Sequence, residues 1–159
     1  MKYSVSEAMK FSEKNELDKW LQLFLRDDSY EHASPNIALA DGLLLEERFY
    51  LGPILIDLDK LTTKRIEKDI KDENDLKYYK EVVDSMFKNY SNYNFPPFIV
   101  EYKDDKLYLT DGNHRYSALR KLGIDKYYVI IWGSKILEKE FKMRWLYENN
   151  IKWIWWKRY

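Results

Sequence analysis

The chain has 159 residues, of which 45% are hydrophobic, enough for one compact core and too little for two comfortable domains. Lys plus Arg and Asp plus Glu both number 27, and this balance argues against a dedicated duplex-DNA binder, which usually carries a basic excess. Cysteine is absent, which excludes a disulfide framework, a thiol nucleophile and a thiolate metal site.

No apolar run approaches the roughly 20 residues that a membrane-spanning helix needs. The opening residues, MKYSVSEAMKFSEKNE, are too polar for a secretory signal. We therefore expect a soluble, cytoplasmic protein with no membrane partner.

The first 47 residues are expected to form a helical extension. Ser4 and Glu7 have the spacing of a capping box ahead of an apolar series, which indicates the start of a helix. A second, amphipathic helix should end near Asp27, because apolar residues recur at intervals of three and four: Leu17, Trp20, Leu21, Phe24 and Leu25. The polar stretch 31–42 then predicts a loop around a short helix.

A β-rich segment begins at Arg48. Gly52 and Pro53 predict a turn ahead of a strand at 54–58. The highly charged stretch 62–95 predicts one or two helices with a solvated break at 71–75, and its charges are expected to face water.

The segment after Pro96 and Pro97 predicts a β-hairpin, helix and strand. The hairpin consists of strands at 98–102 and 106–110 around a polar turn. A short helix at 113–122 with Gly123 as its C-cap follows, and then a buried strand at 126–132.

The last residues predict another amphipathic helix at 134–150 and a tail of unclear structure. Five of the six tryptophans lie between Trp132 and Trp156, and they suit a packing layer, a base-stacking platform or a protein interface. The whole pattern predicts an α/β (mixed α+β) fold, a small mixed sheet covered by helices. We expect one domain, 1–159, with a helical extension (1–47), a core (48–132), and a C-terminal helix with a Trp-rich tail (133–159).

The run Asp111 to Arg115, DGNHR, stands between a predicted strand and a predicted helix. Gly112 allows a sharp turn and close approach of a ligand to the main chain. The first amides of a helix lack partners and carry partial positive charge, which makes this end a site for an anion such as phosphate. Arg115 can clamp phosphate oxygens, and His114 can donate a further hydrogen bond.

The same residues also have structural roles open to them. Asp111 could cap the helix instead of holding a divalent cation, positioning the loop or acting as a base. Gly112 could simply turn the chain, and Asn113 could satisfy a backbone group. His114 could pack on a neighbour, and Arg115 could pair with a carboxylate. The chemistry of the run leaves both interpretations open.

The stretch PPFIVEYKDDKLYLTDGNHRYSALRKLGIDKYYVIIW resembles the core of the ParB N-terminal domain and sulfiredoxin superfamily. Upstream, ILIDLDKL resembles the opening strand of that core, so the resemblance covers roughly Pro53 to Trp132. It implies a ParB/sulfiredoxin-like mixed sheet covered by helices. The residues before and after this stretch inherit no role from it.

The resemblance implies a nucleotide ligand whose phosphates lie at the DGNHR loop. The nucleotide is ATP in sulfiredoxin, CTP in partitioning ParB, and ADP or ATP in the free-serine kinases. Gly112, His114 and Arg115 match the phosphate-binding pattern, and Asp111 matches the aspartate of the kinase-like branch. Asn113 takes the position of the sulfiredoxin cysteine, so the absence of cysteine excludes sulfinic-acid reduction.

Magnesium-dependent NTP hydrolysis or phosphoryl transfer is the implied activity. Asp111 would hold the metal or act as the base, the amides of Gly112 and Asn113 would line the phosphates, and His114 and Arg115 would neutralise charge. The kinase-like members also use a carboxylate after the first strand. Four carboxylates are available in that region, and none aligns cleanly: Asp57, Asp59, Glu67 and Asp69.

Two alternatives remain open. One is a non-catalytic, nucleotide-sensing module that engages a protein partner through the Trp-rich C-terminus. The other is a ParB-like nucleic-acid-binding or nuclease domain, in which tail residues stack bases: Lys152, Trp153, Trp155, Trp156, Lys157 and Arg158. Sliding-clamp segregation is not expected, since the residues after Trp132 are too few for a DNA-reading helix-turn-helix domain.

Overall fold

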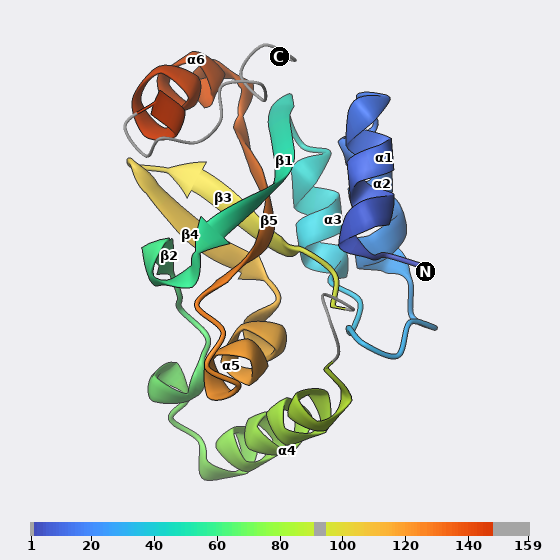
Figure 1. The fold of residues 1–159 in the computed structure, drawn as a ribbon, viewed down its shortest axis with the longest axis vertical. Coiled ribbons are helices and arrows are strands. Elements are labelled where there is room, and N and C mark those ends of the chain that lie inside the picture. Colours follow the sequence, from blue (N-terminus) through green and yellow to red (C-terminus); the bar gives the residue numbers. More distant parts are fainter. Residues whose placement is uncertain (1, 91–94, 148–159) are drawn as a thin grey trace.

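The computed structural model describes residues 2–90 and 95–147. Within them, five strands form one mixed sheet in the order β1-β5-β3-β4-β2 (Figure 1). β1 is antiparallel to β5, β5 is parallel to β3, β3 is antiparallel to β4, and β4 is parallel to β2. The strands are Arg48–Asp57 (β1), Leu61–Thr62 (β2), Phe98–Lys103 (β3), Lys106–Asp111 (β4) and Lys126–Ser134 (β5). The predicted mixed sheet covered by helices is confirmed.

The predicted turn at Gly52 and Pro53 is wrong, because β1 runs through both residues. The register shifts between Leu51 and Ile54, so the irregularity is a bulge within the strand. Gly52 has φ 124°, and a Cβ atom there would lie 2.6 Å from the carbonyl oxygen of Val129 on β5. Glycine at position 52 therefore allows β1 and β5 to approach closely, and the strand continues through it.

The N-terminal extension consists of α1 (Val5–Glu13), α2 (Leu17–Arg26) and α3 (Ile37–Leu43), which lie beside the sheet in Figure 1. The Ser4 hydroxyl accepts a hydrogen bond from the Glu7 amide at 3.1 Å, which confirms the predicted cap. Glu7 does not complete a capping box on Ser4. Its carboxylate accepts from the Tyr3 amide and the Trp20 indole, each at 3.0 Å, and this ties α1 to α2.

Successive side chains along a strand alternate between the two faces of the sheet. Ile99 and Ile130 pack in one apolar cluster with the extension, which supplies Trp20, Leu21, Phe24 and Leu25. Val100 and Ile131 belong to the other cluster, which contains side chains of the later helices. The extension is thus one of two helical layers around the sheet.

The second layer contains α4 (Glu73–Asn89) and α5 (Asn113–Lys121). The predicted break at 71–75 is wrong from Glu73 onward, because the Asp72 carboxylate caps α4 by accepting from the Asp75 amide at 2.9 Å. A short 3-10 helix, η2 (Glu67–Asp69), precedes it. The stretch therefore forms one α-helix and a helical turn.

The predicted C-terminal helix is confirmed in its described part. η3 (Lys135–Leu137), α6 (Glu138–Glu140) and the π-helical η4 (Phe141–Leu146) follow β5 without a break. The Phe141 ring stacks on Phe49 at 5.3 Å and on Trp145 at 5.7 Å, so Trp145 is part of the packing layer.

The predicted tail, including its base-stacking residues and most of its expected partner surface, lies outside the described residues. Among the helices of residues 2–90 and 95–147, none combines the length and apolar character that crossing a bilayer requires.

Candidate functional site

The DGNHR run forms the junction that its sequence predicts. β4 ends at Asp111, Gly112 adopts a left-handed conformation with φ 110°, and α5 starts at Asn113. The first i→i−4 hydrogen bond of α5 is donated by Tyr116 to the Gly112 carbonyl at 2.8 Å. The preceding amides, those of residues 113–115, point out of the amino end of the helix, where the helix dipole adds positive potential.

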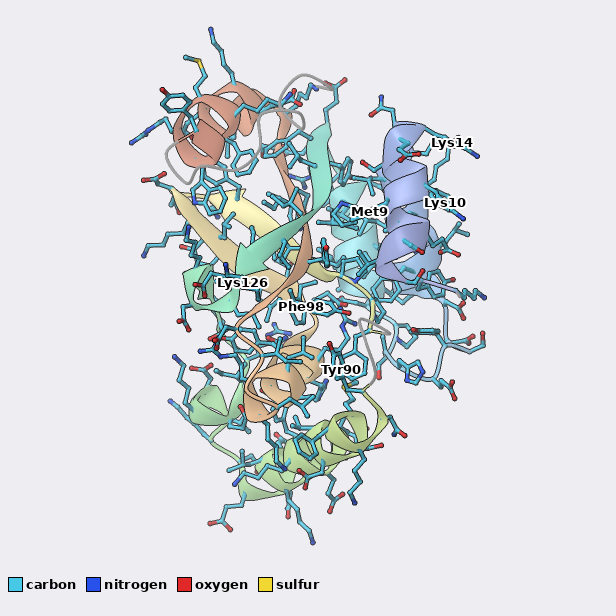
Figure 2. All side chains as sticks on the ribbon, viewed as in Figure 1. Met9, Lys10, Lys14, Tyr90, Phe98 and Lys126 are labelled. Carbon is cyan, nitrogen blue, oxygen red and sulfur yellow. The ribbon has the colours of Figure 1, made fainter. Side chains whose placement is uncertain are left out.

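Gly112 is closely packed on its inner side. A Cβ atom there would lie 2.6 Å from the Phe98 ring and 2.7 Å from a terminal nitrogen of Arg115. Figure 2 shows Phe98 between the strands and α5. The glycine is therefore required by its dihedral angle and by these neighbours, and the Arg115 guanidinium lies directly against the loop.

Arg115 does not face open solvent, although its sequence position suggested a guanidinium presented to a ligand. Only 2% of the Arg115 surface is exposed to solvent. One terminal nitrogen donates to the Pro97 carbonyl and to the Asp111 carboxylate, both at the long distance of 3.4 Å. The guanidinium lies over the rings of Phe24 and Phe98, 5.4 and 5.7 Å from their centroids. Its Nε has no hydrogen-bond partner among the described residues.

Asp111 is held by the N-terminal extension. Its Oδ1 accepts a hydrogen bond from the Asn36 side-chain amide at 3.0 Å, and its Oδ2 faces Arg115. The Asn36 side chain also caps α3, since its Oδ1 accepts from the Leu39 amide at 3.1 Å. Sequence reasoning missed this contact: the Pro-Asn pair at 35–36 signals a helix start but not a partner far along the chain.

Glu67 is the carboxylate that the fold brings to this region. The Tyr79 hydroxyl donates to the Asn113 carbonyl at 2.8 Å and lies 2.8 Å from the Ser117 hydroxyl. Ser117 in turn donates to Glu67 at 3.0 Å. These bonds connect η2, α4 and the first turns of α5.

The other three carboxylates of that region have local roles. Asp57 accepts from the Asp59 amide at 3.0 Å and caps a turn. Asp59 pairs with Arg120. Asp69 accepts from the Ile66 amide at 3.1 Å. None of these contacts involves the DGNHR loop.

His114 is partly buried and lies against Tyr79, with ring centroids 4.5 Å apart. Burial lowers the pKa of His114, and the positive charge of Arg115 lowers it further. The imidazole is therefore neutral at neutral pH and can donate one hydrogen bond. Burial raises the pKa of Tyr79, so its hydroxyl keeps its proton.

A hollow of about 400 Å³ lies beside the Glu67–Ser117 bond. It is lined by residues of η2, α4 and α5 together with Ile66, and they include Glu67, Tyr116, Ser117 and Arg120. It has room for a small molecule next to a carboxylate and a hydroxyl.

Asp111 does not fit the expected role of a magnesium ligand in this arrangement. Both of its oxygens face donors, the Asn36 amide and the Arg115 guanidinium, and its side chain is 12% exposed. Within residues 2–90 and 95–147, His, Asp and Glu side chains form no group of three or more that could hold a metal ion.

No protein-family model and no curated protein matches the chain. Among solved structures, sulfiredoxin from Arabidopsis thaliana is 26% identical, with 52% of this chain and 86% of that chain covered and a TM-score of 0.32. A free serine kinase in complex with AMP is 21% identical over 49% of this chain, with a TM-score of 0.34. A pNOB8-like ParB N-domain is 17% identical over 65% of this chain, with a TM-score of 0.37.

The chain spans 30% of the kinase chain and 36% of the ParB chain.

Proposed function

We propose that this protein binds a nucleoside triphosphate, ATP or CTP, with its phosphates against the amino end of α5. The observation that carries the proposal is Arg115, a 2% exposed side chain whose guanidinium packs against Gly112 and whose Nε lacks a partner among the described residues. A buried charged group whose N–H donors lack hydrogen-bond partners destabilises the folded protein. A phosphate at the adjacent amides would offset that cost, because it pairs with both the guanidinium and the helix end.

His114 supports the same ligand. Its neutral imidazole stands in the first turn of α5, next to the leading amides, and can donate a hydrogen bond to a phosphate oxygen. A bound phosphate would also favour the protonated form and raise the pKa of His114. Nucleotide affinity should therefore increase as the pH falls toward the range in which this histidine gains its proton.

Phosphoryl transfer is the catalytic form of the proposal. Glu67 is the carboxylate placed next to the hollow beside α5, at the Ser117 hydroxyl. As a base it would take the proton of an acceptor hydroxyl or water, whose oxygen then bonds to the terminal phosphorus as the bond to the nucleoside diphosphate breaks. Asp111 has no part in this step as a metal ligand.

Nucleotide sensing without turnover is the second candidate. It is favoured by the engagement of both Asp111 oxygens with protein donors, which compete with a metal ion for this carboxylate. The nuclease alternative depends on residues 151–159 and stays a prediction from the sequence.

Calorimetric titration with ATP and with CTP, each with and without magnesium, tests the binding proposal. Arg115→Lys keeps the charge but loses the planar fork, and His114→Ala removes the ring; each should weaken binding by about tenfold or more. Lys106→Ala, which removes an exposed charge at the far end of β4, is the matched control and should bind like the natural chain. Equal affinities for all four proteins, or no binding at all, would refute the proposal.

Release of inorganic phosphate at saturating nucleotide separates the two candidates. Catalysis requires turnover that Glu67→Gln abolishes while nucleotide affinity stays within about twofold. Binding without phosphate release, or release that survives Glu67→Gln, favours sensing and removes Glu67 from the proposed chemistry.

A further inference from the structure

We propose that the N-terminal extension regulates the phosphate site, with Asn36 as a latch that keeps Asp111 and Arg115 turned away from the ligand. The latch is the hydrogen bond from the Asn36 side-chain amide to Asp111 Oδ1, at 3.0 Å. The inference rests on the nucleotide binding proposed above and names what controls it.

Asn36 is fixed from three sides. Its main-chain amide donates to the Leu25 carbonyl at 2.8 Å, its Oδ1 accepts from Leu39 at 3.1 Å, and its Nδ2 donates to Asp111. The first two bonds belong to the extension, and the third crosses to β4. Asn36 therefore transmits the position of the α2–α3 connection directly to the DGNHR loop.

The extension also closes over Arg115. The guanidinium lies over the Phe24 ring of α2, 5.4 Å from its centroid, and over the Phe98 ring of β3, 5.7 Å from its centroid. The Tyr30 hydroxyl is buried without a hydrogen-bond partner among the described residues. Burial raises the pKa of Tyr30, and the charge of Arg115 opposes that rise. Two buried polar groups thus have unused hydrogen-bonding capacity: the Tyr30 hydroxyl, which belongs to the extension, and the guanidinium of Arg115, over which Phe24 of the extension packs.

The part that has to move is short. Trp20, Leu21 and Leu25 are almost completely buried, so α2 stays packed on the sheet. Asp27 is anchored by the Tyr3 hydroxyl at 2.7 Å. The segment 28–36 after this anchor carries exposed side chains at Asp28, Ser29, Glu31, Ser34 and Pro35. A local movement of 28–36 would break the latch without unfolding a helix.

Breaking the latch removes the hydrogen bond that holds Asp111, the acidic partner of Arg115, in place. The guanidinium already touches Gly112, so a change of its rotamer toward the leading amides would bring it to a phosphate. Nucleotide binding and the closed extension then compete for Arg115. The apparent affinity is reduced by the fraction of molecules that are closed.

Asn36→Ser tests the latch and keeps the helix cap. Serine caps helices well, so α3 retains its N-terminal acceptor, but it has no amide to give to Asp111. We expect Asn36→Ser to bind ATP or CTP about tenfold more tightly than the natural chain, since a hydrogen bond to a charged group holds the closed state. Gln22→Ala is the control. It removes a similar hydrogen bond, from the Gln22 side-chain amide to the Ala40 carbonyl at 2.9 Å, but this bond lies wholly inside the extension.

Unchanged or weaker binding by Asn36→Ser overturns the latch. Tighter binding by Gln22→Ala to the same extent also overturns it, since loosening the extension anywhere would then suffice. If neither the natural chain nor Asn36→Ser binds nucleotide, the proposed function has failed. If both bind equally and His114→Ala does not, only the latch has failed.

A second readout needs no nucleotide. Phenylglyoxal modifies accessible guanidinium groups, and mass spectrometry locates the modified residue. Arg115 should react about tenfold faster in Asn36→Ser than in the natural chain or in Gln22→Ala, with the rate proportional to the open fraction. Equal rates in the three proteins would contradict an opening that Asn36 controls.

Discussion

The Tyr79 hydroxyl on α4 donates to the Asn113 carbonyl at 2.8 Å and thereby fixes the first residue of α5 to a neighbouring helix. Tyr79→Phe removes this bond and the contact with Ser117 while keeping the ring against His114. We expect the free energy of unfolding to fall by about 1–2 kcal/mol, measured by urea denaturation, because the Asn113 carbonyl loses a hydroxyl donor from α4.

The next residue supplies the control for this change. Tyr78 is 66% exposed, so Tyr78→Phe should leave the stability within about 0.5 kcal/mol. The same loss in both variants would show that the Tyr79 bond has no special weight.

Gly112→Ala should be strongly destabilising. The residue has φ 110°, and its new methyl group would meet Phe98 at 2.6 Å and Arg115 at 2.7 Å. Backbone strain and overpacking together predict a loss of roughly 2–4 kcal/mol. Gly42→Ala is the matched control. This glycine lies in α3, and a Cβ atom there would meet no atom of the described residues within 4 Å. Alanine should therefore raise the free energy of unfolding by about 0.5–1 kcal/mol.

Arg115→Met should separate stability from function. Methionine keeps much of the apolar volume between Phe24 and Phe98 and removes a guanidinium whose hydrogen bonds are long or missing. The stability should therefore change by no more than about 1 kcal/mol, while nucleotide affinity falls by at least about tenfold. A large loss of stability would mean that Arg115 is a structural residue, and retained affinity would remove it from the site.

His114 predicts a pH dependence of stability. Burial, assisted by the charge of Arg115, lowers its pKa below the ordinary value of 6.5, so the unfolded chain binds this proton at a higher pH than the folded protein does. The resulting contribution to the free energy of unfolding is present above about pH 6.5 and is lost as the pH falls through the folded-state pKa. The free energy of unfolding, measured by urea denaturation from about pH 7 down to about pH 5, should depend less steeply on pH for His114→Gln than for the natural chain. His32→Gln, which keeps His114, is the control.

Local patterns in the sequence were enough to predict most elements. The three- and four-residue spacing from Leu17 to Leu25 predicts α2, and the alternation around the polar turn at 103–105 predicts the hairpin of β3 and β4. The pair at 52–53 misled because Gly-Pro is a turn signal locally, whereas its role here is set by the backbone of β5 across the sheet.

The junction at Gly112 was predictable, but the surroundings of its side chains were not. The burial of Arg115 depends on Phe24, and the engagement of Asp111 depends on Asn36, both in a segment remote in sequence. Glu67 was one of four equivalent carboxylates until the packing of η2 against α5 brought it to Ser117. Such pairings follow from tertiary packing, which spacing along one segment does not encode.

The extension has a practical consequence for anyone who trims the chain to its sheet. A protein starting at Arg48 would bare Ile99, Ile130 and Trp132, which now lie beneath the first helices. An uncovered apolar sheet face invites aggregation. Such a fragment should come out of the cell in inclusion bodies, so its poor behaviour would say nothing about whether the ligand site works.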